Sequence, residues 1–374
     1  MKKIYLDNAA TTKLDEHVFD AMLPFLKDEF GNPSSIHSFG RKTRSAIETA
    51  RKSVSKLLNV TPAEIFFTSG GTEADNMAIV QTISSHNIKH AITSKIEHHA
   101  VEHTLQVLEK EGKIKLSWVN IDNKGNVDLA HLETLLQNNE RSFVSLMHAN
   151  NEIGTLLPIE QVGKICEKHN AIFHSDTVQT MGHYSMNLPE LKVHLVTCAA
   201  HKFHGPKGVG FLYINHQLKI NPFIHGGAQE RNMRGGTENV SGIIGLAKAL
   251  EICNAEMIEH MQHIQELKTY MRKKVESEIP GTIINGENDE NSLYTVLNCC
   301  FPKSDKGEML LFNLDIHGIA ASGGSACSSG SNQGSHVLRG IGADMERPSV
   351  RFSFSKYSTK EEIDFVVSKL KELL

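Results

Sequence analysis

The sequence predicts an α/β protein with a mainly parallel sheet in a large domain and a smaller C-terminal α/β domain. Strand-like and amphipathic helical segments alternate over residues 65–215, the pattern of parallel strands joined by crossover helices. A helical run without proline covers residues 239–277, and a helix of that length often links two domains. Strands near residues 294–300 and 350–354, and helices near 307–314 and 360–373, then predict the smaller domain.

Composition limits the possible functions. The 374 residues are 40% hydrophobic and 22% charged with a net charge of -4, as in a globular chain of about two domains. Without a basic stripe interleaved with aromatic residues, we expect no nucleic-acid partner. The start MKKIYLDNAATT has no apolar core of a signal peptide, and no apolar run is long enough to span a membrane. We therefore expect a cytoplasmic protein that does not bind membranes.

The first segment with a candidate binding motif is residues 64–80, EIFFTSGGTEADNMAIV. Its pattern predicts a strand, a glycine turn and a helix. Gly71 would let the backbone approach an anion, the helix amino terminus would supply N–H groups, and Thr72 would add a hydroxyl. This predicts a phosphate cradle, although a plain connecting turn has the same pattern. The segment has neither GxxxxGK[ST] nor GxGxxG, which disfavours ATP and dinucleotides.

The second element is a short buried strand in residues 171–179 that ends at Asp176. A carboxylate there needs a cationic partner, and the ring nitrogen of pyridoxal phosphate is one, because an aspartate beside it keeps it protonated. Asp176 could instead cap a helix or begin an Asx turn.

The third element is AAHKFHGPKGVG, residues 199–210, which follows the apolar run 194–198. Lys202 comes directly after this predicted strand, where burial would lower the pKa of the amine and make it a nucleophile toward an aldehyde. A lysine that merely caps a strand remains an alternative. The presence of both Lys202 and Asp176 favours the cofactor interpretation.

Six cysteines without CxxC spacing indicate a reducing compartment rather than a disulfide framework. We expect five of them to be buried thiols: Cys166, Cys198, Cys253, Cys299 and Cys300. Cys327 differs because it lies in the glycine- and serine-rich stretch 321–335, which predicts an exposed loop. An exposed thiol is easily oxidised, so its presence favours a chemical role, with a chance surface cysteine as the alternative.

Ten motifs along the chain together carry a family resemblance. They are YLDNAATT (5–12), FGNPSSIHSFG (30–40), TSGGTEADN (68–76), EHHAV (97–101), MHANNEIG (147–154), HSDTVQ (174–179), HKFHGPKG (201–208), HGGAQERNMRGGTENV (225–240), SGGSACSSGS (322–331) and VRFSFS (350–355). With them the chain resembles, from end to end, the cysteine desulfurases, which are pyridoxal phosphate enzymes of the class V aminotransferase family. The long loop holding SAC resembles the NifS/IscS-type branch more than the SufS-type branch.

The resemblance implies the aspartate-aminotransferase-like fold, known as pyridoxal phosphate fold type I. We accordingly place the large cofactor-binding domain at residues 15–255, and the small domain at 1–14 together with 256–374. The small domain would then carry the loop of the catalytic cysteine. The resemblance also implies a homodimer.

The resemblance assigns roles to individual residues. Lys202 matches the Schiff-base lysine, Cys327 the catalytic cysteine, and His98 the imidazole that stacks on the ring and moves protons. The other matched residues are Asp176 for the ring nitrogen; Gln179 and Asn151 near the ring oxygen; Gly71, Thr72 and His201 for the phosphate; Thr237 for the phosphate of the other subunit; and Asn151 and Arg351 for the substrate carboxylate. One position departs from the family pattern, because Ala199 stands where a serine or threonine is usual.

The implied reaction removes sulfur from L-cysteine, releases L-alanine and leaves a persulfide on Cys327 for iron-sulfur cluster assembly or another sulfur-acceptor protein. Alternatives are a selenocysteine lyase, another aminotransferase-fold enzyme that would not need Cys327, and a sulfur-carrier module without catalysis. Metal binding is not expected. Pairs such as His98 with His99, or His260 with His263, have no third ligand at a suitable spacing in the sequence.

Overall fold

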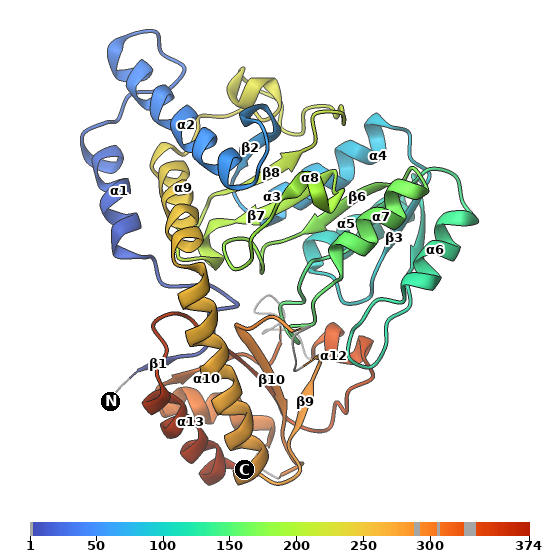
Figure 1. Ribbon diagram of the computed structural model, residues 1–374, viewed down its shortest axis with the longest axis vertical. Helices are drawn as coiled ribbons and strands as arrows, with labels where there is room; N and C mark the ends of the chain where they lie inside the picture. The colour runs from blue at the N-terminus through green and yellow to red at the C-terminus, as the bar shows by residue number, and fades with distance from the viewer. Residues whose placement is uncertain (1–2, 288–291, 305–306, 325–333) are drawn as a thin grey trace.

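The computed structural model describes residues 3–287, 292–304, 307–324 and 334–374 of the chain. Its larger part is built on a seven-stranded sheet in the order β2-β8-β7-β6-β5-β3-β4 (Figure 1). The strands are β2 (Ile65–Thr68), β3 (His90–Thr93), β4 (Lys115–Trp118), β5 (Ser142–Ser145), β6 (Ile172–Asp176), β7 (Leu195–Ala199) and β8 (Gly210–Ile214). β8 pairs antiparallel with β2 and β7, and the other pairs in this sheet are parallel. The prediction of a mainly parallel sheet is therefore confirmed.

Both faces of this sheet are covered, as a parallel sheet requires. Successive residues of β6 and β7 enter different cores: Phe173 and Val196 belong to one apolar cluster, Ile172 and Leu195 to another. The first cluster includes residues of α1 (Glu16–Lys27), α2 (Ser38–Leu57), α6 (Leu129–Gln137), α7 (Ile159–Lys168), α8 (Leu188–Leu191) and α9 (Val240–Ala255). The second includes residues of α3 (Gly71–Asn76), η2 (Met77–Gln81), α4 (Thr82–Ser85) and α5 (His99–Lys110).

The smaller part has an antiparallel sheet in the order β12-β10-β9. Its strands are β9 (Ile283–Asn285), β10 (Val296–Cys300) and β12 (Ser349–Ser353), and its helices are α10 (Met257–Glu278), α11 (Leu310–Ile316), α12 (His336–Gly340) and α13 (Lys360–Leu373). Residues of α10, α11 and α13 pack against β10 and β12 in one core. Short 3-10 turns complete the described chain: η1 (Pro62–Glu64), η3 (Ala200–Lys202), η4 (Gln229–Asn232) and η5 (Gly307–Met309).

The prediction of one long helix over residues 239–277 is wrong in one respect, because the structure has two helices there. α9 ends at Ala255, and α10 begins at Met257. Glu256 between them has φ -105° and ψ 11°, outside the helical geometry. The two helices follow each other from the larger part into the smaller part (Figure 1).

The N-terminal segment joins the two parts. β1 (Ile4–Tyr5) pairs in parallel with β11 (Ile319–Ala320), and Nδ2 of Asn8 donates to the carbonyl of Ser353 at 2.8 Å. Thr12 then donates, through its backbone N–H, to the carbonyl of His201 in the larger part. The first described residues therefore contact both parts of the molecule.

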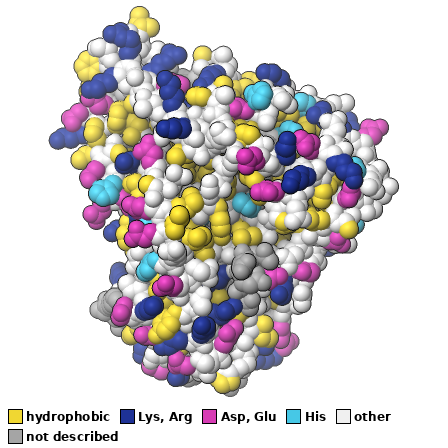
Figure 2. Space-filling view, viewed as in Figure 1, with side chains coloured by type: hydrophobic (Ala, Val, Ile, Leu, Met, Phe, Trp, Pro, Cys, Tyr) yellow, Lys and Arg dark blue, Asp and Glu magenta, His cyan; other side chains and the backbone are white. Residues whose placement is uncertain are grey.

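The surface seen in Figure 2 mixes Lys and Arg with Asp and Glu over most of its area, so this face has no basic stripe. Its hydrophobic side chains gather where the larger and smaller parts meet. Among the described residues, no helix has both the length and the apolar character needed to cross a membrane.

Candidate active site

A cavity of about 220 Å³ opens at the carboxyl ends of β6 and β7, the edge of a parallel sheet where ligands commonly bind. Its lining comes from the sheet edge, from α3, from the N-terminal segment and from β12. The lining residues are Ala9, Ala10, Gly71, Thr72, Asp75, His98, Met147, Asn151, Asp176, Val178, Gln179, Ala199, His201, Lys202 and Arg351. Nine of the predicted site residues therefore meet in one place: Gly71, Thr72, His98, Asn151, Asp176, Gln179, His201, Lys202 and Arg351.

Lys202 ends η3, the turn that directly follows β7. Its Nζ donates to the backbone carbonyl of Ala9 at 2.6 Å and to that of Ala10 at 2.9 Å. Carbonyl oxygens solvate the ammonium group without neutralising its charge. The N-terminal segment therefore holds the amine at the cavity wall.

Asp176 is the last residue of β6 and is buried. Its Oδ1 accepts a hydrogen bond from the N–H of Val178 at 2.9 Å. Burial raises the pKa of this carboxyl to about 6, while the hydrogen bond from Val178 and the charge of Lys202 act in the opposite direction. Asp176 is therefore a carboxylate that a cation in the cavity would stabilise.

Two further buried carboxyl groups, which the sequence did not single out, lie beside Asp176. Burial raises the pKa of Asp75 on α3 well above its usual range, and the charge of Asp176 raises it further. Burial also raises the pKa of Glu97 to about 8; Glu97 accepts hydrogen bonds from Oγ of Ser94 at 2.7 Å and from the N–H of Met147 at 2.9 Å. Asp75 and Asp176 line the cavity, and Asp176, with the lower pKa of about 6, is the carboxyl group of the three that carries the negative charge at neutral pH.

One oxygen of this wall lacks a hydrogen bond. Oδ1 of Asp75 is buried without a hydrogen-bond partner in the described part of the chain. It lies 3.5 Å from Nε2 of His174, whose pKa burial lowers to about 3, so that ring is neutral at neutral pH. A hydrogen-bond donor in the cavity would give this buried oxygen the partner that it lacks.

His98 is the N-cap of α5, and its Nδ1 accepts a hydrogen bond from the N–H of Ala100 at 3.2 Å. This bond fixes the ring at the cavity, with Nε2 as the nitrogen that carries the proton of the neutral form. Burial, and after it the nearby charge of Lys202, lower the pKa of His98 to about 4. His98 is therefore a neutral imidazole at neutral pH, and its Nε2–H can donate a hydrogen bond or a proton.

The predicted anion cradle lies at the amino end of α3, which continues through η2 and α4 as one helical segment. A Cβ on Gly71 would lie 3.0 Å from Cγ2 of Val178, so a side chain at position 71 would crowd this wall of the cavity. Gly70 before it has φ 151°. Of the two other residues predicted to contact the phosphate, Thr72 is exposed. Nδ1 of His201 lies 3.1 Å from Oγ1 of Thr11.

Arg351 lies on β12 and is almost fully buried, with 1% of its side chain exposed. Nη1 donates to the carbonyl of Asn151 at 2.9 Å, and Nη2 donates to Oδ1 of Asp7 at 2.7 Å. Nε is buried and makes no hydrogen bond to the described residues. The guanidinium therefore already has an anionic partner, Asp7, which the sequence did not suggest.

Gln179 is also buried, and its Nε2 donates to the carbonyl of Ala9 at 3.1 Å. That carbonyl therefore accepts hydrogen bonds from both Gln179 and Lys202. Ala199, at the end of β7, is 2% exposed and lines the same cavity.

One predicted site residue is not at this cavity, and another lies outside the described residues. Thr237 lies before α9, is exposed, and is absent from the cavity lining. Cys327 lies outside the described residues. The five other cysteines are buried, in line with the expectation for them.

Comparisons with known proteins agree along the whole chain. The sequence profile of the family described as Aminotransferase class-V matches residues 4–366. A protein of Dictyoglomus turgidum named "Cysteine desulfurase IscS" is 46% identical over 377 residues, covering 100% of this chain and 95% of the relative. A solved NifS-like protein is similar with a TM-score of 0.91 and 38% identity, covering 99% of both chains.

A second solved structure, "SspA in complex with cysteine", is 30% identical with a TM-score of 0.82 and covers 96% of this chain and 100% of its own. The similarity therefore includes a protein solved with this amino acid bound.

Proposed function

Because the chain belongs to the class V aminotransferase family and, within it, to the cysteine desulfurases, we propose that the cavity holds pyridoxal 5'-phosphate and removes sulfur from L-cysteine. The observation that carries this proposal is the meeting of Lys202, Asp176, His98 and Arg351 around one cavity. The four come from distant parts of the sequence. Together they offer an amine, an acid, a neutral imidazole and a cation.

The described residues fit this cofactor. Asp176 is buried in the cavity wall with a pKa of about 6, and a protonated ring nitrogen would give its carboxylate a positively charged partner. Beside it, Oδ1 of Asp75 is buried without a hydrogen-bond partner among the described residues. The absence of a side chain at Gly71 leaves room at the amino end of α3 for an anion such as the phosphate. Thr72 and His201 line the same cavity and would add polar contacts to the phosphate. When bound, pyridoxal phosphate supplies an electron sink that stabilises negative charge at the α-carbon of an amino acid.

Lys202 and His98 would move the protons. To act on a substrate, Nζ of Lys202 must exchange its hydrogen bonds to the carbonyls of Ala9 and Ala10 for contacts in the cavity. The neutral ring of His98 could donate its Nε2 proton near the sulfur and take it back. Gln179 and Asn151 would orient the cofactor and the substrate from the buried side.

Arg351 would bind the substrate carboxylate. Its Nε has no hydrogen-bond partner among the described residues, and Nη2 could exchange Asp7 for a substrate oxygen. Two parallel N–H donors of a guanidinium suit a carboxylate. We therefore assign Arg351 and Asn151 to the end of the cavity that receives the carboxylate.

We further propose that the thiolate of Cys327 attacks the sulfur of the bound cysteine. An S–S bond forms, the Cβ–S bond of the substrate breaks, and the remaining carbon skeleton takes up a proton and leaves as L-alanine. The enzyme keeps the sulfur as a persulfide, so no external oxidant or reductant is needed. The persulfide would then pass to a scaffold for iron-sulfur clusters or to another acceptor protein.

We propose a homodimer in which Thr237 reaches the phosphate of the partner's cofactor, which suits its exposed position away from the cavity of its own chain. We also keep the division into a large domain at 15–255 and a small domain at 1–14 with 256–374. The apolar core formed by α10, β10, β12 and α13, which includes Ile4 and Leu6, supports that division.

The decisive experiment loads the purified chain with pyridoxal phosphate and supplies L-cysteine. One alanine for each sulfur transferred, with a persulfide on Cys327, is expected. Selenocysteine lyase activity would appear as turnover of selenocysteine that does not depend on Cys327. Transfer of an amino group to pyruvate would instead indicate an aminotransferase.

A further inference from the structure

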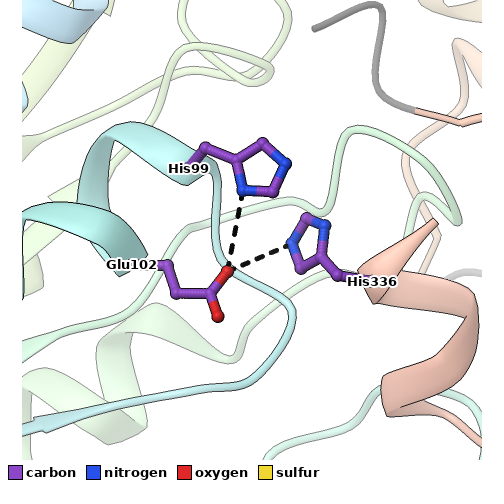
Figure 3. A group of neighbouring side chains, drawn as sticks. All are labelled: His99, Glu102 and His336. Atoms are coloured by element: carbon purple, nitrogen blue, oxygen red, sulfur yellow. Dashed lines mark ion pairs between the residues drawn. The ribbon is translucent and has the colours of Figure 1, made fainter. Parts of the chain in front are cut away.

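A group of side chains outside the cavity joins the start of α5 to the start of α12 (Figure 3). Nδ1 of His99 lies 3.7 Å from Oε2 of Glu102, and Nε2 of His336 lies 3.6 Å from the same oxygen. The three atoms all lie within 4.8 Å of one another. None of these residues lines the cavity or takes part in the proposed reaction.

The three side chains project from helices and are partly exposed to solvent. His99 and Glu102 are three residues apart on α5, so they lie on one face of the helix, and His336 is the first residue of α12. The side chains of His99, Glu102 and His336 are 23%, 16% and 17% exposed, which leaves a path for an ion from solvent.

One ligand atom in the group has no hydrogen bond. Nδ1 of His99 is buried and makes none with the described residues. A neutral imidazole nitrogen with a free lone pair is the form that binds metal ions.

The donor set and its spacing suit one class of ion. Two imidazole nitrogens and one carboxylate oxygen, with a fourth position left for water, are a common set for Zn²⁺. Ligand bonds of about 2.0–2.1 Å in tetrahedral geometry separate the ligand atoms by about 3.3 Å. The observed separations of 3.6 and 3.7 Å need only a small inward movement to reach that value.

We infer that His99, Glu102 and His336 form a second site on this enzyme, which binds a zinc-type divalent transition-metal ion and links α5 to α12. The alternative is that a protonated histidine simply pairs with Glu102. Binding of the ion requires one rearrangement. Nε2 of His336 lies 2.9 Å from the carbonyl of Glu97, and this nitrogen must give up that contact and carry its proton on Nδ1 instead.

The test uses protein loaded with pyridoxal phosphate in a Cys327→Ser background, stripped with a chelator and dialysed. The serine removes a thiol that could bind zinc elsewhere. The loaded form is used because the other possible ligand group, Asp75, His98 and Asp176, lines the cavity or lies beside it. Equilibrium dialysis with Zn²⁺ is expected to give one ion per chain, and the ion is expected to raise the unfolding temperature.

Glu102→Gln and His336→Gln should each weaken zinc binding by about tenfold or more and remove the rise in unfolding temperature. His260→Gln is the matched control, because His260 also pairs with a carboxylate on a helix, Glu256 at 2.9 Å, but belongs to no described group of three ligands. This control should bind zinc like the parent protein.

Co²⁺ gives an independent measurement, because an ion bound by nitrogen and oxygen ligands in tetrahedral geometry absorbs visible light strongly. The parent and the His260→Gln protein should show this spectrum, and His99→Gln should lose it. Failure of the parent to bind zinc, or equal binding by Glu102→Gln, His336→Gln and the control, would overturn the inference. If one variant does not fold, the other variants and the cobalt spectrum still show whether these residues bind the ion.

Discussion

Nη2 of Arg351 lies 2.7 Å from Oδ1 of Asp7, so a strand near the end of the chain is paired with a residue near its beginning. The guanidinium is 1% exposed and the carboxylate 18% exposed. Asp7 also accepts a hydrogen bond from Oγ of Ser322 at 2.8 Å. The residue that we expect to bind the substrate carboxylate is therefore held by a carboxylate of the chain itself.

Replacing Asp7 with asparagine should destabilise the protein, because the buried charge of Arg351 loses its compensation. Asparagine still accepts hydrogen bonds, so we expect a fall of about 2 kcal/mol in the free energy of unfolding. Urea unfolding of Asp7→Asn and of the exposed control Asp20→Asn measures it. Equal stability of the two variants would mean that the ion pair contributes nothing in solution.

Lys202→Ala should reduce alanine release by at least about a thousandfold, because the amine that carries and moves protons at the cavity is lost. Lys207 is an exposed lysine in the same motif, so Lys207→Ala is the matched control and should keep its activity. Borohydride reduction of both proteins locates the cofactor. If Lys202→Ala still retains the cofactor covalently and turns over, another lysine holds that role.

Cys327→Ser should keep cofactor and substrate binding but form no persulfide, since a hydroxyl is a poor nucleophile toward sulfur at neutral pH. The change of the cofactor's visible spectrum on adding L-cysteine reports binding, and mass spectrometry reports the persulfide. Ser328→Ala, at the next position, serves as the control. Full-rate alanine release by the serine variant with a mild reductant would point to a lyase that releases sulfur directly.

Ala199→Ser should slow dissociation of the cofactor. Ala199 lines the cavity, and a well-formed hydrogen bond to a phosphate oxygen contributes roughly 1.5–3 kcal/mol, or less if a water already makes it. The rate of alanine release should change little. Ala200→Ser is the control, because Ala200 does not line the cavity. Unchanged or faster cofactor loss from Ala199→Ser would show that position 199 does not face the phosphate.

Glu97 should make the cofactor-free protein less stable as the pH rises. Its pKa is about 8 in the folded state against 4.5 for an unperturbed side chain, so the folded state keeps a proton that the unfolded state has lost. The free energy of unfolding therefore falls between those two values, by about 2 kcal/mol from pH about 6.5 to about 8.

Glu97→Gln tests this dependence, because glutamine resembles the protonated acid and can keep bonds to Ser94 and Met147. We expect the variant to lose little stability over the same range, as measured by urea unfolding at each pH. The exposed Glu16→Gln is the control and should follow the parent. A parent protein whose stability stays constant over this range would mean that Glu97 is already ionised.

The sequence could predict the parts of the site that depend on local pattern. Asp176 and Lys202 follow short apolar runs, and such runs form the strands of a buried parallel sheet, so their place at one sheet edge could be inferred. The strands and helices of the smaller part were also recognisable, apart from short elements such as β1 and α12, which carry too few residues to show a period.

The rest depends on contacts between distant residues. The pattern of residues 5–12 does not show that the carbonyls of Ala9 and Ala10 accept bonds from Lys202. Glu97 looked like an ordinary charged residue before α5, and only its burial among other acids explains its raised pKa. No glycine or proline near Glu256 signals the break between the two helices. Tertiary packing, which the sequence pattern does not show, decides where α9 ends.

The N-terminal segment has a consequence for biosynthesis. Residues 4–12 are made long before β11 and β12, yet Ile4 and Tyr5 pair with β11, and Asn8 binds Ser353 on β12. A nascent chain can form the seven-stranded sheet while its first residues still lack these partners. We therefore expect the enzyme to become able to retain its cofactor only after β12 has been made, so that premature termination before β12 yields a folded sheet with no working pocket.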